Sequence, residues 1–125
     1  MSKIEAKKRW NRTPFHVEDG KRYRFTSVGN WQDASHDCSA TGYTADSLRR
    51  WEWLKRERNA KWFSVIGRID KRRSTQFDIG RLIDTDEVYI ATATGILFCF
   101  ANDVWFMYWN NKGAIDIELH PVESE

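Results

Sequence analysis

The chain has 125 residues, 41% of them hydrophobic and 30% charged, and its 20 Lys and Arg against 18 Asp and Glu leave a net charge of +2. This length predicts one domain with a core of its own, and so even a charge balance does not indicate nucleic acid as a partner. No stretch is long and apolar enough to span a bilayer and the first residues lack a signal-peptide pattern, so we expect a cytoplasmic protein unless it leaves by a non-classical export route.

The chain begins with a polar, basic segment. We expect residues 1–13 to form a flexible basic arm, followed by a single domain over residues 14–120 and an acidic tail over residues 121–125. Within the domain, short runs of alternating apolar residues or of β-branched and aromatic residues, bounded by turn signals, predict strands. These runs lie at residues 15–17, 22–28, 62–69, 76–80, 87–93, 96–101 and 114–119.

Few apolar residues occupy the stretch between the second and third of these runs. We expect residues 31–44 to form a long loop, and long loops in compact domains are often functional. One short helix is expected near residues 46–56, where Leu48, Trp51 and Leu54 recur at every third position after a candidate N-cap. Roughly seven short strands with little helix predict an all-β fold, an antiparallel β-sandwich of the jelly-roll-like kind.

The chain contains seven tryptophans, far above average usage. Trp31 and Trp62 fit core positions, whereas Trp51 and Trp53 cannot share one helix face, so one of these two is expected at the surface. Tryptophan is costly to leave in water and is enriched at recognition surfaces. We therefore expect part of this set to be core and part to lie at a surface.

Catalytic and zinc chemistry find little support in the sequence. Nucleophilic catalysis requires a nucleophile, a base and an orienting group in one place, and residues 36–38 (His-Asp-Cys) are neighbours in a loop, where adjacent side chains point different ways. Three His and two Cys without pair spacing do not match a zinc site. Cys99 lies in an apolar strand pattern typical of a buried thiol, and whether it pairs with Cys38 is left open. We expect a protein that is not an enzyme.

The stretch from Asn102 to Gly113 has oxygen donors at both ends and aromatic residues between them. Calcium takes 6–8 oxygen ligands, and Asp103, Asn110 and Asn111 each carry at least one. Adjacent side chains of a straight strand face opposite ways, so both carboxamides reach one ion only where the backbone bends, which Gly113 favours. The alternative is that Asn-Asn-Lys-Gly is a hairpin turn that binds no ion.

A family resemblance is carried by these same residues. The stretch resembles the calcium- and galactose-binding loop of the LecA-type bacterial galactophilic lectins. The residues that carry the resemblance are Asn102-Asp103-Val104 and, after a short loop, Tyr108-Trp109-Asn110-Asn111-Lys112-Gly113. Further motifs similar to those of the family follow the same order along the chain, from about residue 15 to residue 119. They are Gly29-Asn30-Trp31, Thr41-Gly42-Tyr43, Ser64 to Ile69, Phe77 to Gly80 and Gly95 to Phe98.

The resemblance implies a galactose-binding-like β-sandwich with calcium at this loop. It implies three side-chain ligands and two main-chain carbonyl ligands to the ion: Asp103, Asn110 and Asn111, and the carbonyls of Met107 and of Asp33 or Ala34. Two sugar hydroxyls would complete the coordination shell, and Asp103 and Asn110 would also hydrogen-bond to them.

The centre of the loop departs from the family pattern. Trp105-Phe106-Met107 stands where the family has small residues, and the region of a second sugar-contacting loop, residues 46–53, has no clear match. The aromatic residues of the loop, with Trp105 and Tyr108 as candidate ligand contacts, suit a sugar platform, an oligomer contact or a buried plug.

Two functions follow from these observations. The first is a calcium-dependent carbohydrate-binding module of galactose type. The alternative is a β-sandwich interaction or oligomerisation domain that has lost sugar binding and uses the Trp-rich loop as its contact. The expected partner is accordingly a galactoside or a protein, which includes a second copy of the chain.

Overall fold

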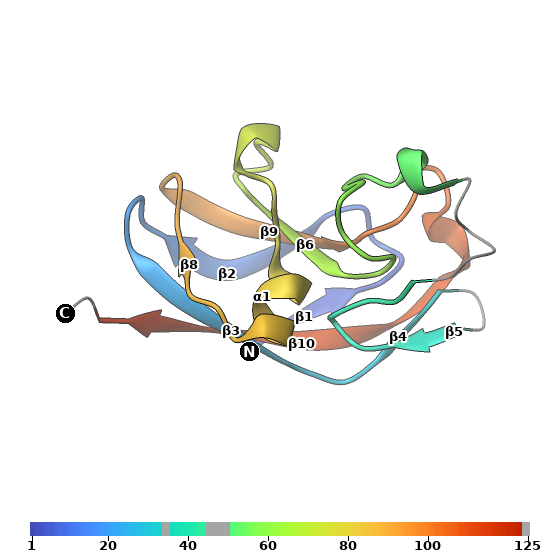
Figure 1. Ribbon diagram of the computed structural model, residues 1–125, viewed down its shortest axis with the longest axis horizontal. Coiled ribbons are helices and arrows are strands. Elements are labelled where there is room, and N and C mark those ends of the chain that lie inside the picture. The colour runs from blue at the N-terminus through green and yellow to red at the C-terminus, as the bar shows by residue number, and fades with distance from the viewer. Residues whose placement is uncertain (34–35, 45–50, 124–125) are drawn as a thin grey trace.

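Figure 1 shows the computed structural model, which describes residues 1–33, 36–44 and 51–123. Two antiparallel sheets pack face to face and enclose one main apolar core, so the predicted all-β sandwich is confirmed. Within the described residues, no helix is long and apolar enough to cross a membrane.

The larger sheet is built around the long strand β10, Asn111–Val122. Its strands run in the order β5-β4-β10-β3-β8, and β1 also pairs with β10. The other members are β1 Ser2–Glu5, β3 Arg22–Val28, β4 Trp31–Asp33, β5 His36–Cys38 and β8 Tyr89–Ile90.

The smaller sheet has the order β2-β9-β6-β7. Its strands are β2 Asn11–Val17, β6 Val65–Ile69, β7 Phe77–Asp78 and β9 Gly95–Ala101. Alternate side chains of β9 point to opposite faces, so Leu97 and Cys99 enter the core while Phe98 and Phe100 lie on the outer face. Both Cys38 and Cys99 are free thiols.

The N-terminal segment does not form the predicted arm. Residues 2–5 form β1, which pairs with β10, and residues 11–13 belong to β2. Ile4 and Ala6 are fully buried in the core between charged neighbours. The lysines of this segment made the alternation of Ile4 and Ala6 with polar residues difficult to recognise. The strand forms because it pairs with β10. At the other end, β10 extends to Val122 and so includes part of the predicted tail.

Two further local expectations differ from the structure. The predicted loop over residues 31–44 contains the short strands β4 and β5, which extend the larger sheet. Residues 79–80, predicted as a strand end, begin the helix α1 Ile79–Thr85, whose N-cap Asp78 accepts a hydrogen bond from the Arg81 N–H. Of the helix expected near 46–56, residues 51–54 form a 3-10 turn and residues 46–50 lie outside the described chain.

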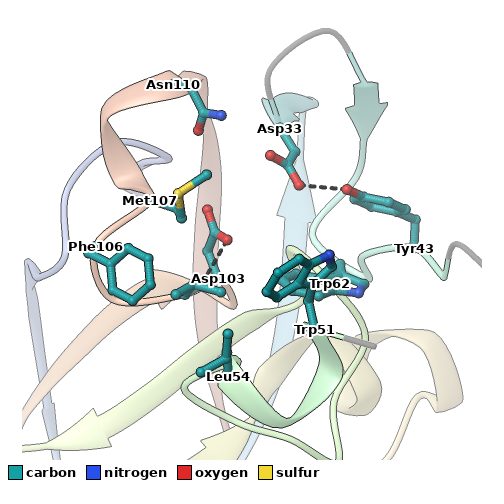
Figure 2. Close-up of a pocket in the computed structure, with 10 residues that line it drawn as sticks. Asp33, Tyr43, Trp51, Leu54, Trp62, Asp103, Phe106, Met107 and Asn110 are labelled. Carbon is teal, nitrogen blue, oxygen red and sulfur yellow. Dashed lines mark hydrogen bonds between the residues drawn. The ribbon is translucent and has the colours of Figure 1, made fainter. Parts of the chain in front are cut away.

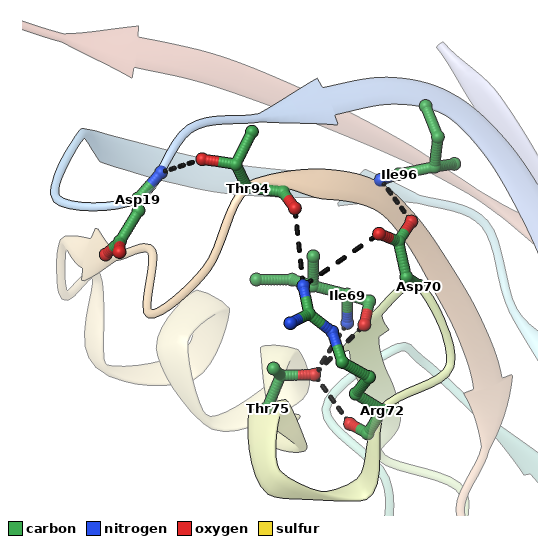
Figure 3. A network of polar contacts seen from close by, with 7 residues as sticks. All are labelled: Asp19, Ile69, Asp70, Arg72, Thr75, Thr94 and Ile96. Atoms are coloured by element: carbon green, nitrogen blue, oxygen red, sulfur yellow. Dashed lines mark hydrogen bonds and ion pairs between the residues drawn. The ribbon is translucent and has the colours of Figure 1, made fainter.

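A tight turn after β6 is fixed by polar contacts (Figure 3). The Asp70 carboxylate accepts a hydrogen bond from the Ile96 N–H at 2.9 Å, and Arg72 donates to the Thr94 carbonyl at 3.3 Å. Asp70 and Lys71 both have positive φ, of 52° and 62°, a conformation that an L-residue adopts only when its surroundings impose it. From this turn, Lys71 reaches the outer face of the smaller sheet, where its Nζ lies over the Phe98 ring.

Candidate functional site

The loop between β9 and β10 is held by two buried side chains near its ends. The Asn102 carboxamide is fully buried, accepts from the Glu57 N–H at 2.9 Å and donates to the Lys61 carbonyl at 2.9 Å. Tyr108 is 1% exposed and donates its hydroxyl proton to the Ala101 carbonyl. These contacts fix the loop at both ends and leave its centre to turn outward.

Asp103 lies on this loop and is 4% exposed. Its Oδ1 accepts from the Val104 N–H at 2.7 Å, while its Oδ2 is buried and has no hydrogen-bond partner among the described residues. Burial and, to a smaller extent, the nearby Asp33 raise the pKa of this carboxyl to about 7, although the Val104 N–H and the Asn111 carboxamide act to lower it. A cation beside a buried carboxylate with an unpaired oxygen would stabilise its charged form.

The two carboxamides at the other end of the loop, those of Asn110 and Asn111, also have oxygens that lack a hydrogen-bond partner among the described residues. Asn110 ends the 3-10 helix η3, Tyr108–Asn110, and Asn111 begins β10 in extended conformation. The backbone therefore bends between them, which is the condition for both carboxamides to reach one ion. Asn111 donates from Nδ2 to the Ala6 carbonyl at 3.0 Å, which orients its carboxamide. Within the described chain, Oδ1 of both asparagines is buried without a hydrogen-bond partner.

A cavity of about 510 Å³ opens beside these groups (Figure 2). Figure 2 shows Asp33, Asp103 and Asn110 around its polar end, with aromatic and aliphatic side chains below them. Its lining comes from three separate segments of the chain: Asp33, Tyr43, Trp51, Leu54, Trp62, Asp103, Val104, Phe106, Met107 and Asn110.

Asp33 adds a second carboxylate to the polar end of the cavity. It lies on β4 and is the register partner of Asn111 on β10, which explains how two distant segments meet. The Tyr43 hydroxyl donates to its Oδ2 at 2.5 Å, and burial and this hydrogen bond raise the pKa of Tyr43. The resemblance implied only a carbonyl at Asp33 or Ala34, and Ala34 lies outside the described residues.

The predicted site residues thus fall into two groups. Asp103, Met107 and Asn110 line the cavity, and the Asn111 carboxamide interacts with the Asp103 carboxyl. Trp105 and Tyr108, predicted as ligand contacts, lie elsewhere.

The structure gives Trp105 and Tyr108 other surroundings. Tyr108 is core, and the Trp105 ring packs against Trp10 with centroids 6.3 Å apart. Consecutive residues of an irregular loop point in different directions, which is why Phe106 rather than Trp105 faces the cavity.

Three aromatic residues of the cavity were missed from the sequence. Trp62 and Tyr43 face each other through an isolated β-bridge, with hydrogen bonds of 2.8 and 3.0 Å between their main chains. Trp51 belongs to the 3-10 turn. The buried state of Trp31 and Trp62 is as expected, but burial of Trp62 also places its ring against the cavity. No local pattern links these positions; only the excess of tryptophan hinted at them.

Arg56 connects the loop to the outer face of the smaller sheet. Its backbone N–H donates to the Asp103 carbonyl at 3.1 Å, and its Nη1 donates to the Tyr108 hydroxyl at 3.0 Å and to the Arg9 carbonyl at 2.7 Å. Its guanidinium carbon lies 4.6 Å from the centre of the Trp105 ring. Arg56 therefore braces the loop from the side opposite the cavity.

The donor set at the cavity is an oxygen set. Among the described residues, no three His, Cys, Asp or Glu side chains gather in a metal-binding cluster. Carboxylate, carboxamide and main-chain oxygens are instead what a hard cation such as calcium takes, whereas zinc prefers nitrogen and sulfur. The residues present therefore fit calcium.

Neither protein-family models nor curated proteins give a significant match to the sequence. Several solved structures match the fold. One is the N-terminal domain of EclA, a PllA-like lectin, with a TM-score of 0.64 and 15% identity over 97% of this chain and 94% of that chain. The fold is lectin-like. At 15% identity the likeness concerns the fold alone.

Proposed function

We propose that this lectin-like domain is a calcium-dependent carbohydrate-binding module of galactose type that catalyses no reaction. One observation carries the proposal: Asp103, Asn110 and Asn111, from both ends of one loop, each hold a buried oxygen without a hydrogen-bond partner among the described residues. Leaving such an atom unsatisfied costs on the order of 1–3 kcal/mol, so three around one loop indicate a missing partner. In this proposal, one cation is the partner of all three oxygens.

Calcium suits the number of oxygens as well as their type. Asp103, Asn110 and Asn111 would supply side-chain oxygens, and Met107, which lines the cavity, would add its main-chain carbonyl. Because calcium takes 6–8 oxygens, positions remain for two hydroxyls of a ligand. The ion would also offset the repulsion between Asp33 and Asp103, which raises the pKa of Asp103.

The rest of the cavity suits a sugar. A monosaccharide has hydroxyls on its edge and an apolar C–H face, and the cavity has oxygens at one end and Trp62, Phe106 and Met107 beside them. The PllA-like lectin that shares the fold gives the proposal further support. Galactose is the sugar to test first, because the loop resembles that of galactophilic lectins.

Calorimetry tests the proposal directly. Calcium is titrated into EDTA-stripped protein and galactose is then added, for the wild type, Asp103→Ala and the control Asp84→Ala, which removes an exposed carboxylate on α1. We expect calcium heat and calcium-dependent galactose binding in the wild type and the control, and neither in Asp103→Ala. Absence of calcium heat in the wild type at millimolar concentrations would refute the proposal, and a calcium effect that survives Asp103→Ala would place the ion elsewhere.

A second candidate, a protein contact, is favoured by the exposed aromatics near the cavity. Trp53, Phe106 and Trp109 are 64%, 63% and 78% exposed. Such residues are enriched at protein interfaces, and a second copy of this chain is the first partner to test. Light scattering over a range of concentrations measures the oligomeric state. A dimer that Trp109→Ala dissociates would support this function, whereas a monomer at all concentrations would contradict self-association.

A further inference from the structure

The outer face of the smaller sheet carries cations interleaved with aromatic rings. We call this surface the basic face, and its rings are Trp10, Phe98, Phe100 and Trp105. Five cations belong to it. Four of them place their charged group within 6 Å of the centre of one of these rings: Arg9, Arg56, Arg68 and Lys71. The fifth, Arg12, is the strand partner of Phe98 in the sheet. It shares no residue with the cavity lining.

Strand register builds the centre of the basic face. Phe98 on β9 is paired with Arg12 on β2 and with Arg68 on β6, so the three side chains form a row on one side of the sheet. Because neighbouring strands lie about 4.8 Å apart, the two arginines are separated by roughly 10 Å at the backbone. Lys71 joins the row from the turn after β6, with its Nζ 5.1 Å from the Phe98 ring.

Two rings of the basic face, Trp10 and Phe100, are already covered by cations. The Arg56 guanidinium carbon lies 3.3 Å from the centre of the Phe100 ring and 4.6 Å from that of Trp10. Arg68 and Lys71 lie 5.1 and 5.4 Å from the Trp10 ring. Cation–π contacts hold the positive groups in place, but they do not neutralise them.

The cations of the basic face also lack carboxylate partners. Elsewhere in the described chain, cations pair with acids, as in Lys8–Glu5, Lys21–Glu18 and Arg24–Asp86. None of the five cations of the basic face makes an ion pair with a described carboxylate within 4.0 Å.

Neighbouring groups do not remove this excess charge. Burial, Arg56 and Arg73 lower the pKa of Arg68, and the opposing effect of Glu57 is smaller. Arg56 Nη2 is buried with no hydrogen-bond partner in the described chain. The face therefore has positive charge in excess and at least one unused donor.

We propose that the basic face binds a sulfated polysaccharide, at a site separate from the cavity and without calcium. Guanidinium groups bind oxyanions through paired N–H donors, and a linear row of them suits a linear chain of sulfates. A nucleic acid is a poorer occupant, because single strands bind by stacking successive bases on open rings, and of these four rings only Trp105 is exposed. An anionic membrane is also less suited, since Trp105 is the only exposed large apolar residue of this face among those described.

The test uses a heparin octasaccharide in EDTA and the full chain. The test variant is Arg12→Gln with Lys71→Gln, both exposed, and it spares Arg56, which braces the loop. The control, Arg22→Gln with Arg81→Gln, removes the same charge from exposed positions on β3 and α1. We expect calorimetry to show binding by the wild type that weakens with salt, a loss of tenfold or more in the test variant, and a change within twofold in the control.

Any one of the following results would overturn the proposal. They are no binding of the octasaccharide at 50 mM salt, equal losses in the two double variants, equal affinity for a single-stranded oligonucleotide of the same charge, and tighter binding to vesicles with anionic lipid. Binding that requires calcium would place the ligand in the cavity and would also contradict it. Galactose and calcium binding by the same samples tests the cavity separately, so either proposal can fail alone.

Discussion

The cavity and the basic face lie on opposite sides of one loop, and each lacks a different kind of hydrogen-bond partner among the described residues. At the cavity, Asp103, Asn110 and Asn111 present buried oxygens that lack donors within the described chain. At the basic face, Arg56 presents a buried donor that lacks an acceptor there. Each deficiency indicates the charge of the ligand that would remove it: a cation at the cavity and an oxyanion at the basic face.

The difference also explains the aromatic centre of the loop. Trp105 turns to the basic face, where Arg9 donates to its carbonyl at 2.6 Å, whereas Phe106 and Met107 turn to the cavity. The centre of the loop is therefore neither a single sugar platform nor a single plug. It separates two surfaces of different chemistry. Arg56 hydrogen-bonds to both ends of this loop, at the Asp103 carbonyl and the Tyr108 hydroxyl.

The largest effect is expected at the Asp103 carboxyl in metal-free protein. Its pKa in the folded state, about 7, is above the ordinary 3.8, so between these values the unfolded chain loses a proton that the folded chain keeps. The free energy of unfolding should fall by up to about 4 kcal/mol as pH rises through this window. Asp103→Asn should remove most of the fall and be more stable than the wild type at pH 7.5 in EDTA.

Urea denaturation from pH 4.5 to pH 8 measures this effect. If calcium binds here, millimolar calcium should reverse the order of the two proteins at pH 7.5, because only the wild type keeps the charged ligand. Identical pH profiles for both proteins would contradict the buried, unpaired state of Asp103.

Removal of Arg56 tests the brace between the two surfaces. Arg56→Ala loses the hydrogen bond to the Tyr108 hydroxyl and the contacts with the Phe100 and Trp105 rings. We expect a loss of about 2–3 kcal/mol in the free energy of unfolding and weaker calcium binding. Arg68→Ala, in the same face but without contact to the loop, is the control and should leave calcium affinity unchanged. Equal calcium affinity in Arg56→Ala and the wild type would show that the brace does not position the ligands.

A smaller effect is expected at the second carboxylate of the cavity. Tyr43→Phe removes the hydroxyl that donates to Asp33 and keeps the ring. We expect a loss of about 1 kcal/mol in the free energy of unfolding, measured by denaturation in EDTA. Added calcium should reduce that loss if the ion lies close enough to compensate Asp33. A loss that is unchanged by calcium would place the ion away from this residue.

The smallest effect is expected at Trp109. Because its side chain is 78% exposed, Trp109→Ala should change the free energy of unfolding by no more than about 0.5 kcal/mol. Thermal denaturation at two protein concentrations measures this change. A larger loss that grows with concentration would reveal a contact between copies of the chain.

Several elements were accessible from the sequence because their signals are local. The strand at 22–28 alternates polar and apolar residues and forms β3 with the same bounds. The run at 96–101 forms most of β9. Segments with conflicting local signals were assigned wrongly: lysines around Ile4 concealed β1, and Gly80 was read as a strand end although it lies in α1. Gly80 is required there by a close approach, since a Cβ would lie 2.1 Å from the Ser64 Oγ.

The sequence by itself determined which oxygen donors the loop contains and where along the chain they lie. Asp103, Asn110 and Asn111 carry this information in their order and spacing. The tertiary structure alone decided what surrounds them, because burial, register and side-chain direction depend on distant segments. It placed Asp33 beside Asn111 by strand pairing, used the Ala6 carbonyl to orient the Asn111 carboxamide, and turned Trp105 away to the basic face.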